Sequence, residues 1–207
     1  FSMSSSTSNE STPVAGATDP GRRRGRRLAL AILAVCAAPF VAAWFAYFVW
    51  QPQSRMNYGE LIETRPLIDP ELHRLDGAPF RLSQLRGKWV LLQLDSGACA
   101  DACRRKLLYM RQLRLAQGGE MERIERVWLV TDRAAPDISL LRDYDGAYVV
   151  RAAGSPILAE FPAARSASDH IYIVDPLGNL MLRFPKDPEP RRMLQDLARL
   201  LKVSRIG

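Results

Sequence analysis

The sequence contains few of the residues that most often do chemistry at metal and redox sites. Its 207 residues include only three cysteines and two histidines. It has no H-E-x-x-H motif and no glycine-rich phosphate loop, so the usual signals of a metalloprotease or a nucleotide-binding enzyme are missing. Internal repeats are absent as well. Any chemistry of this chain therefore depends on a small number of side chains.

Charge is missing from one long stretch, residues 28–50, from Leu28 to Trp50. At about 1.5 Å per residue this segment makes a helix of roughly 34 Å, whereas a bilayer core is about 30 Å thick. A secretory signal peptide has a shorter apolar region and ends in small residues, but this segment ends in aromatic ones. We expect a single transmembrane anchor, with Cys36 as a small residue inside it.

The net charge of +7 does not indicate a nucleic-acid-binding protein. Five of the 29 basic residues stand directly before the apolar segment, and residues 51–207 carry 24 basic and 20 acidic residues, a net of only +4. Basic flanks of a membrane helix stay in the cytoplasm. The pattern predicts a disordered basic cytoplasmic tail over residues 1–27 and places the chain after Trp50 in the periplasm of an inner-membrane protein.

Residues 51–74 read as a linker, and residues 75–207 as a folded domain in which strands and helices alternate. Short apolar runs are typical of buried strands, and apolar residues at three- and four-residue steps are typical of helices. The predicted strands are 89–94, 127–130, 171–174 and 180–184, and the predicted helices are 107–115, 136–144 and 190–201. This order predicts an α/β fold in which a mixed sheet has helices on both faces. It is the thioredoxin-like order, although other α/β folds share it.

Cys99 and Cys103 lie where the first buried strand leads into the first helix. A helix N-terminus lowers the pKa of a nearby thiol, because its free N–H groups and dipole favour the thiolate. A spacing of four residues places both sulfurs on one helix face. Such a pair can form a disulfide or bind a soft metal such as copper. A merely structural disulfide is the alternative, although so short a loop would constrain the unfolded chain little.

The charged residues around the pair have ordinary interpretations. The run Arg104-Arg105-Lys106 follows Cys103 directly, and we interpret it as a solvated helix face. Asp95, Asp101 and Asp132 could suggest metal-assisted hydrolysis, but acidic residues are common at strand ends and no accompanying motif supports this chemistry.

Residues 82–132 resemble the Sco family of copper-binding cytochrome oxidase assembly proteins. The resemblance is carried by the C-x-x-x-C motif after the first core strand, by Asp101 between the cysteines, and by the flanking segments 82–91 and 172–178. The prolines that usually follow each cysteine are replaced by Ala100 and Arg104. The resemblance implies a thioredoxin-like domain on one membrane anchor, with Cys99 and Cys103 binding Cu(I).

The resemblance also implies a histidine ligand before the late strand. His170 is in that region, and an alignment without gaps on Tyr172 and Pro176 puts the family's histidine at Ala167. We expect copper ligands Cys99, Cys103 and His170.

The expected role is that of a metallochaperone. Its implied client is a cytochrome c oxidase subunit or another membrane-embedded protein. Two alternatives stay open: a thiol–disulfide oxidoreductase that keeps copper-ligand cysteines of a client reduced, which needs only the sulfurs, and a redox-inactive assembly scaffold, which needs neither.

Overall fold

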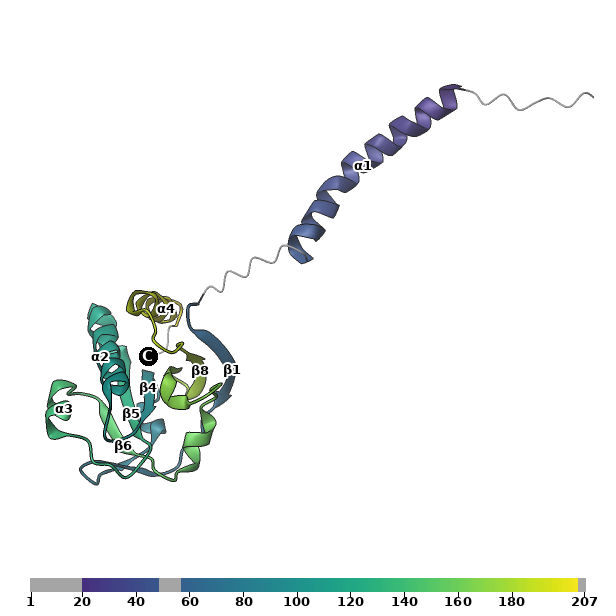
Figure 1. The fold of residues 1–207 in the computed structure, drawn as a ribbon. Coiled ribbons are helices and arrows are strands. Elements are labelled where there is room, and N and C mark those ends of the chain that lie inside the picture. Colours follow the sequence, from purple (N-terminus) through teal and green to yellow (C-terminus); the bar gives the residue numbers. More distant parts are fainter. Residues whose placement is uncertain (1–19, 49–56, 205–207) are drawn as a thin grey trace, which may run out of the picture. The chain divides into compact units, whose positions relative to one another are not determined.

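The computed structural model describes residues 20–48 and 57–204 (Figure 1). The chain divides into two compact units, residues 1–54 and residues 55–207, and each has its own internal contacts.

The first unit is represented by one helix, α1 (Pro20–Phe48). Its portion Gly25–Phe45 is exposed and is long and apolar enough to cross a membrane. This is the candidate span that the uncharged stretch predicts. The helix begins earlier than expected, because residues 20–27 form its first turns instead of belonging to the tail. Residues 1–19 of the expected tail and residues 49–50 of the expected span lie outside the described residues.

The second unit is built on an eight-stranded mixed sheet with the order β1-β8-β7-β4-β5-β6-β2-β3. The strands β4, β5 and β6 run parallel, and every other pairing is antiparallel. The strands are β1 (Glu60–Pro66), β2 (Leu72–Arg74), β3 (Pro79–Phe80), β4 (Trp89–Asp95), β5 (Ile124–Val130), β6 (Tyr148–Arg151), β7 (Ile171–Val174) and β8 (Asn179–Arg183).

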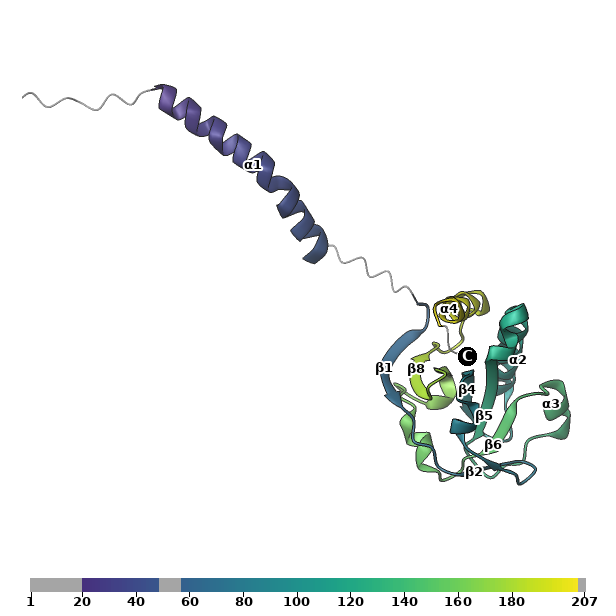
Figure 2. The same ribbon diagram turned by 180° about the vertical axis from the view of Figure 1, so that it is seen from behind.

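Helices cover the two faces of the sheet unequally. The helices α2 (Asp101–Ala116), α3 (Ile138–Asp143) and α4 (Pro190–Val203) contribute to one core, and α2 and α4 lie side by side (Figures 1 and 2). The opposite core is closed by the 3₁₀ helices η1 (Leu82–Leu85) and η3 (Pro156–Glu160). Two further 3₁₀ helices are η2 (Gly118–Arg123) and η4 (Ala167–Asp169). The expected mixed, thioredoxin-like sheet is confirmed, with 3₁₀ turns in place of α-helices on its second face.

Part of the linker expected over residues 51–74 belongs to the sheet. Glu60–Pro66 forms β1, which pairs with β8, and Leu72–Arg74 forms β2, which pairs with β6. Six of the seven residues of β1 are exposed. An edge strand that packs only lightly on the core does not need the apolar pattern by which strands are recognised. Residues 51–56 lie outside the described residues.

The residues just before β1 are held against α4. The backbone N–H of Gly59 donates to Asp196 Oδ2 at 2.8 Å, and Asp196 is only 2% exposed. The Tyr58 hydroxyl accepts from the backbone N–H of Glu189 at 3.0 Å, and the Arg192 guanidinium lies 4.2 Å from the centre of the Tyr58 ring. A side chain at Gly59 would collide with Leu182. These contacts fasten the beginning of the domain to its last helix.

Candidate functional site

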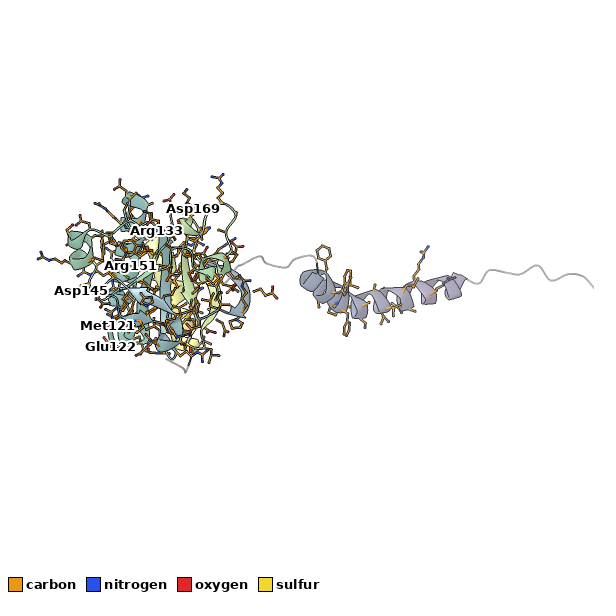
Figure 3. The ribbon with its side chains drawn as sticks, turned by 90° about the horizontal axis from the view of Figure 1, so that it is seen from below. Met121, Glu122, Arg133, Asp145, Arg151 and Asp169 are labelled. Carbon is orange, nitrogen blue, oxygen red and sulfur yellow. A yellow bond between two sulfur atoms is a disulfide. The ribbon has the colours of Figure 1, made fainter. Side chains whose placement is uncertain are left out.

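The candidate site lies at the end of the sheet that is formed by the C-terminal ends of β4 and β5. These strands are parallel and β7 is antiparallel to β4, so the segment before β7 lies at the same end of the sheet. Figure 3 shows Arg133, after β5, and Asp169, before β7, at one end of the domain, while Met121 and Glu122 lie at the other. The loop from Ser96 to Ala100 carries the chain from this end of the sheet into α2.

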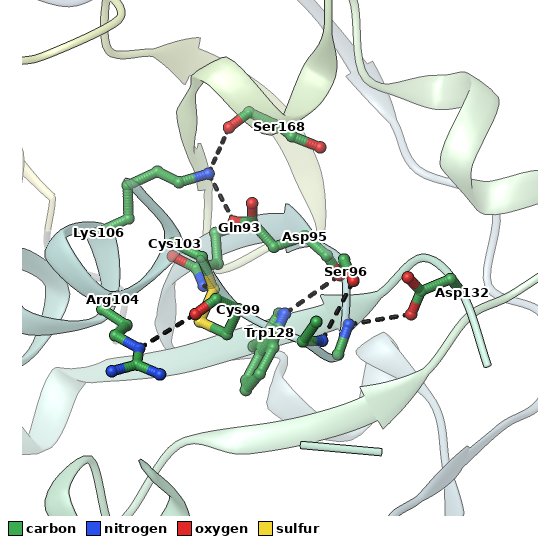
Figure 4. Close-up of a disulfide and its surroundings, with 12 residues drawn as sticks. Gln93, Asp95, Ser96, Cys99, Cys103, Arg104, Lys106, Trp128, Asp132 and Ser168 are labelled. Carbon is green, nitrogen blue, oxygen red and sulfur yellow. Dashed lines mark hydrogen bonds and ion pairs between the residues drawn. A yellow bond between two sulfur atoms is a disulfide. The ribbon is translucent and has the colours of Figure 1, made fainter. Parts of the chain in front are cut away.

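Cys99 and Cys103 are joined by a disulfide at the start of α2 (Figure 4). Their Cα atoms are 5.1 Å apart, and the two residues are 1% and 2% exposed. Cys99 has a positive φ of 41°, which is uncommon outside glycine and which often marks a functional position. Ala98 and Ala100 on either side of Cys99 are exposed. Cys99 is therefore buried between two exposed residues of the loop.

A buried amide contacts the disulfide from the sheet. Gln93 on β4 is fully buried, and its Nε2 lies 3.4 Å from Cys103 Sγ, to which it donates. Its Oε1 has no hydrogen-bond partner among the described residues. A buried polar group without a partner is costly. Gln93 can donate to a thiolate more strongly than to a disulfide sulfur, because hydrogen bonds to charged acceptors are the stronger ones.

The loop before Cys99 is fixed by the loop after β5. Asp132 Oδ1 accepts from the backbone N–H of Gly97 at 2.9 Å and of Ala134 at 3.1 Å. Hydrogen bonds from the Ser96 side chain and from the Gly97 N–H lower the pKa of the Asp132 carboxyl. Gly97 is required here, because a Cβ on it would lie 1.9 Å from the carbonyl oxygen of Ala134. Asp132, expected as a strand-end residue, thus holds the loop that carries the pair.

The interpretation of residues 104–106 as a solvated helix face is wrong for Lys106. Its Nζ lies 2.6 Å from Asp95 Oδ2, and the two side chains are only 7% and 12% exposed. It also donates to the backbone carbonyl of Ser168 in η4. Figure 4 shows this ammonium between the end of β4, the first turns of α2 and η4. Lys106 stands three residues after Cys103, so its helical position already indicated the buried face.

Burial is the main influence on the ionisation of this pair. It raises the pKa of the Asp95 carboxyl and lowers the pKa of the Lys106 ammonium, while their mutual attraction opposes both shifts. The other two cations of the run, Arg104 and Arg105, are exposed, as the sequence predicts. Arg104 Nε additionally donates to the Cys99 carbonyl at 3.1 Å.

The structure does not bring His170 together with the cysteines. Its Nδ1 lies 2.8 Å from the carbonyl oxygen of Phe184, and its ring contacts the Tyr172 ring with centroids 5.9 Å apart. Tyr172 belongs to the core on one face of the sheet, whereas Cys99 and Cys103 belong to the core on the other. Ala167, where the aligned histidine would fall, lies in η4.

No three His, Cys, Asp or Glu side chains gather as a potential metal site within the part of the chain that the structure describes. The pair alone is a chemically suitable donor set for Cu(I), because soft thiolates select this ion. Cu(I) would be cargo, and binding would require the disulfide to be reduced first.

The fold and the cysteine pair define a thioredoxin-like protein, and comparison with known structures agrees. The domain is similar to yeast Sco1 with copper bound (TM-score 0.57, 15% identity, 69% of this chain and 96% of that chain). It is also similar to apo Sco1 from Thermus thermophilus (TM-score 0.52, 20% identity, 72% and 98%). A third similar structure is the thioredoxin domain of a thiol-disulfide oxidoreductase from Bacteroides vulgatus (TM-score 0.50, 16% identity, 68% and 99%). At these identities the likeness concerns the fold.

The sequence matches two protein-family models. Residues 89–204 match the transmembrane-like, thioredoxin-like C-terminal domain, and residues 19–49 match the transmembrane-like N-terminal domain. No curated protein matches the sequence. Because the first of these matches covers more than half of the chain, the chain belongs to the transmembrane-like, thioredoxin-like family. Membrane anchoring by α1 agrees with both the family match and the apolar helix.

Proposed function

We propose that this chain is a membrane-anchored dithiol protein that binds Cu(I) through Cys99 and Cys103 and delivers it to a respiratory haem-copper oxidase during assembly. The observation that carries the proposal is the placement of both sulfurs, in bonding distance of each other, at the N-terminus of α2 and beyond the C-terminal end of β4. The similarity to the Sco fold supports the choice of metal and client.

The chemistry requires a reduced pair. Two electrons and two protons from an external dithiol reductant convert the disulfide into two thiols. One Cu(I) then replaces both thiol protons and forms a bis-thiolate complex, which a client's own sulfur ligands can take over by ligand exchange. The helix N-terminus and the Gln93 amide stabilise the negative charge on the sulfurs.

A second function is favoured by the disulfide itself. The reduced pair could attack a client disulfide, pass through a mixed disulfide, and leave the client with two thiols while Cys99 and Cys103 become bonded again. In this role the chain would keep copper-ligand cysteines of the client reduced. The burial of the cysteines makes either reaction dependent on a local opening of the chain around the pair.

The first experiment measures Cu(I) binding by the reduced full chain in detergent against a chromogenic Cu(I) chelator. We expect one Cu(I) per chain, and an affinity loss of more than about a hundredfold for Cys99→Ser and for Cys103→Ser, because one thiolate cannot form the complex. Cys36→Ser is the matched control: it removes a free cysteine of α1 and should leave binding unchanged.

His170→Ala tests the third ligand. Since the ring lies on the Tyr172 side of the sheet, His170 can join the sulfurs only if the segment before β7 rearranges on reduction. We expect unchanged stoichiometry in this variant; a large affinity loss would make His170 a ligand. Absence of Cu(I) binding in the wild type, with exchange against a model disulfide intact, would leave the reductase. A wild-type chain that neither binds Cu(I) nor exchanges with the model disulfide would leave the scaffold.

We propose in addition that residues 1–27 are cytoplasmic and that the domain from residue 75 onward lies in the periplasm. The arginines before α1's apolar portion support this orientation, and a disulfide persists in an oxidising compartment. Protease added to intact spheroplasts should digest the domain, while a soluble cytoplasmic marker survives. A domain that is cut only after the membrane is broken would reverse the orientation.

A further inference from the structure

The exposed face of α4 is cationic. Arg191, Arg192, Arg199 and Lys202 are all exposed, while Asp196, which is the one carboxylate in the helix, is buried and bonded to the Gly59 N–H. The side chains that α4 exposes therefore include four cations and no carboxylate.

The four cations form one stripe along the helix. Positions seven and eleven residues apart return to the same side of an α-helix. Arg192 and Arg199 are seven apart, and Arg191 and Lys202 are eleven apart. The other side of the helix is used for packing, since Met193, Leu197 and Leu201 are buried in the core. The stripe thus faces away from the core, and its four side chains are exposed although Arg192 also contacts the Tyr58 ring.

Only a short stretch of sequence links this helix to the membrane span. Tyr58 and Gly59 are fastened to α4 by the contacts with Asp196, Arg192 and Glu189. Ten residue steps separate Tyr58 from Phe48, where α1 ends. A fully extended chain spans at most about 3.3–3.6 Å per residue, so the fastened point stays within about 36 Å of the end of α1.

We propose that the cationic stripe of α4 binds anionic lipid headgroups of the membrane in which α1 is anchored. Clustered Lys and Arg side chains are attracted by the negative potential of such a surface. The covalent tether adds to this attraction, because it converts binding into an intramolecular event at high effective concentration. The proposal rests on the membrane anchoring and is independent of copper binding and of disulfide exchange.

The test uses the full chain in nanodiscs made of phosphatidylcholine alone or with one quarter phosphatidylglycerol. Phenylglyoxal labels accessible arginine side chains, and mass spectrometry gives the rate at each site. We expect labelling of Arg191, Arg192 and Arg199 to be about fivefold slower in the anionic discs. The protection should disappear at about 0.5 M NaCl, where the Debye length falls to about 4 Å.

Two triple variants of equal charge change separate this face from the rest of the domain. Arg191→Gln/Arg199→Gln/Lys202→Gln should abolish the protection of the remaining Arg192. The matched control Arg133→Gln/Arg151→Gln/Arg165→Gln removes three exposed cations from outside α4, two of which are labelled in Figure 3, and should preserve the protection.

Equal labelling in both kinds of disc would overturn the proposal, and the stripe would then be solvated or reserved for an acidic protein. Equal protection of Arg133, Arg151 and Arg165 would overturn it as well, because the attraction would then belong to the whole domain instead of to α4. The labelling rates contain no copper or redox readout, so either result leaves the proposed function standing.

Discussion

Replacing Lys106 with methionine should destabilise the folded domain by about 3–5 kcal/mol at neutral pH. The substitution removes the ammonium that lies 2.6 Å from Asp95 Oδ2 and leaves that carboxylate buried without its counter-charge. It also removes the hydrogen bond to Ser168, so α2 loses its connection to η4. Pulse proteolysis of the detergent-solubilised chain in increasing urea would measure the loss.

The deficit of Lys106→Met should shrink as the pH falls. Burial already holds the pKa of Asp95 above its ordinary value of 3.8, and Lys106 is the main influence that lowers it. Without Lys106 the folded-state pKa rises further, while the unfolded-state pKa stays at the ordinary value. A raised folded-state pKa means that the native state binds the proton more tightly, so stability is regained as pH falls through that pKa and is lost above it.

The control is the double variant Asp95→Asn/Lys106→Met. With the carboxylate gone, it should lack the pH dependence of the single variant, and it should be the more stable of the two at neutral pH. A Lys106→Met protein whose stability is unchanged, or whose deficit is the same at every pH, would show that the ion pair does not hold this part of the fold.

Gly97→Ala should cost about 3 kcal/mol, the upper end of what overpacking usually costs. The added Cβ would meet the Ala134 carbonyl oxygen at 1.9 Å, and this backbone atom cannot turn aside as a flexible side chain could. The loop that ends at Cys99 must therefore move, and the hydrogen bond from Gly97 to Asp132 is lost with it. Because that loop ends at the buried Cys99, its movement should expose the disulfide and make reduction by dithiothreitol faster.

Gly119→Ala is the matched control, since nothing lies within 4 Å of a Cβ at Gly119. It should change neither the urea midpoint nor the reduction rate. If Gly97→Ala behaves in the same way, the contact between the two loops has no influence on the stability of the domain or on access to the sulfurs.

The buried elements are the ones that the sequence predicts. β4, β5, β7 and β8 carry continuous or alternating apolar residues, and α4 carries apolar residues at helical spacing, so each is predicted within a few residues of its bounds. The same spacing predicts α2, although the helix begins at Asp101, six residues before the predicted start. β1 escapes prediction because its side chains are mostly exposed, and β2 and β3 because three or two residues give no period to recognise. β6, with four residues, escapes it for the same reason.

The environment of the cysteine pair is only partly predictable. The position of Cys99 and Cys103 between a strand and a helix follows from the local sequence pattern. The residues that surround the pair in the folded domain do not. Gln93 is the one polar residue within the apolar run 89–94, which is an available signal for a role at the pair. Ser168 contributes a backbone carbonyl, and no side-chain pattern can reveal such a contact. The side of the sheet on which His170 lies depends on the register between β7 and β4, which one sequence does not specify.

The pairing of β1 with β8 affects how the domain can fold while the chain is being synthesised. Glu60 is hydrogen-bonded alongside Arg183, so the first strand of the domain finds its partner only after almost all of the chain has been synthesised. Contacts this distant in sequence form late and slow the overall folding rate. Until β8 has been synthesised, β1 has no partner strand. Its exposed and charged side chains reduce the risk of aggregation during this time, because charge on an unpaired strand discourages pairing with a neighbouring nascent chain.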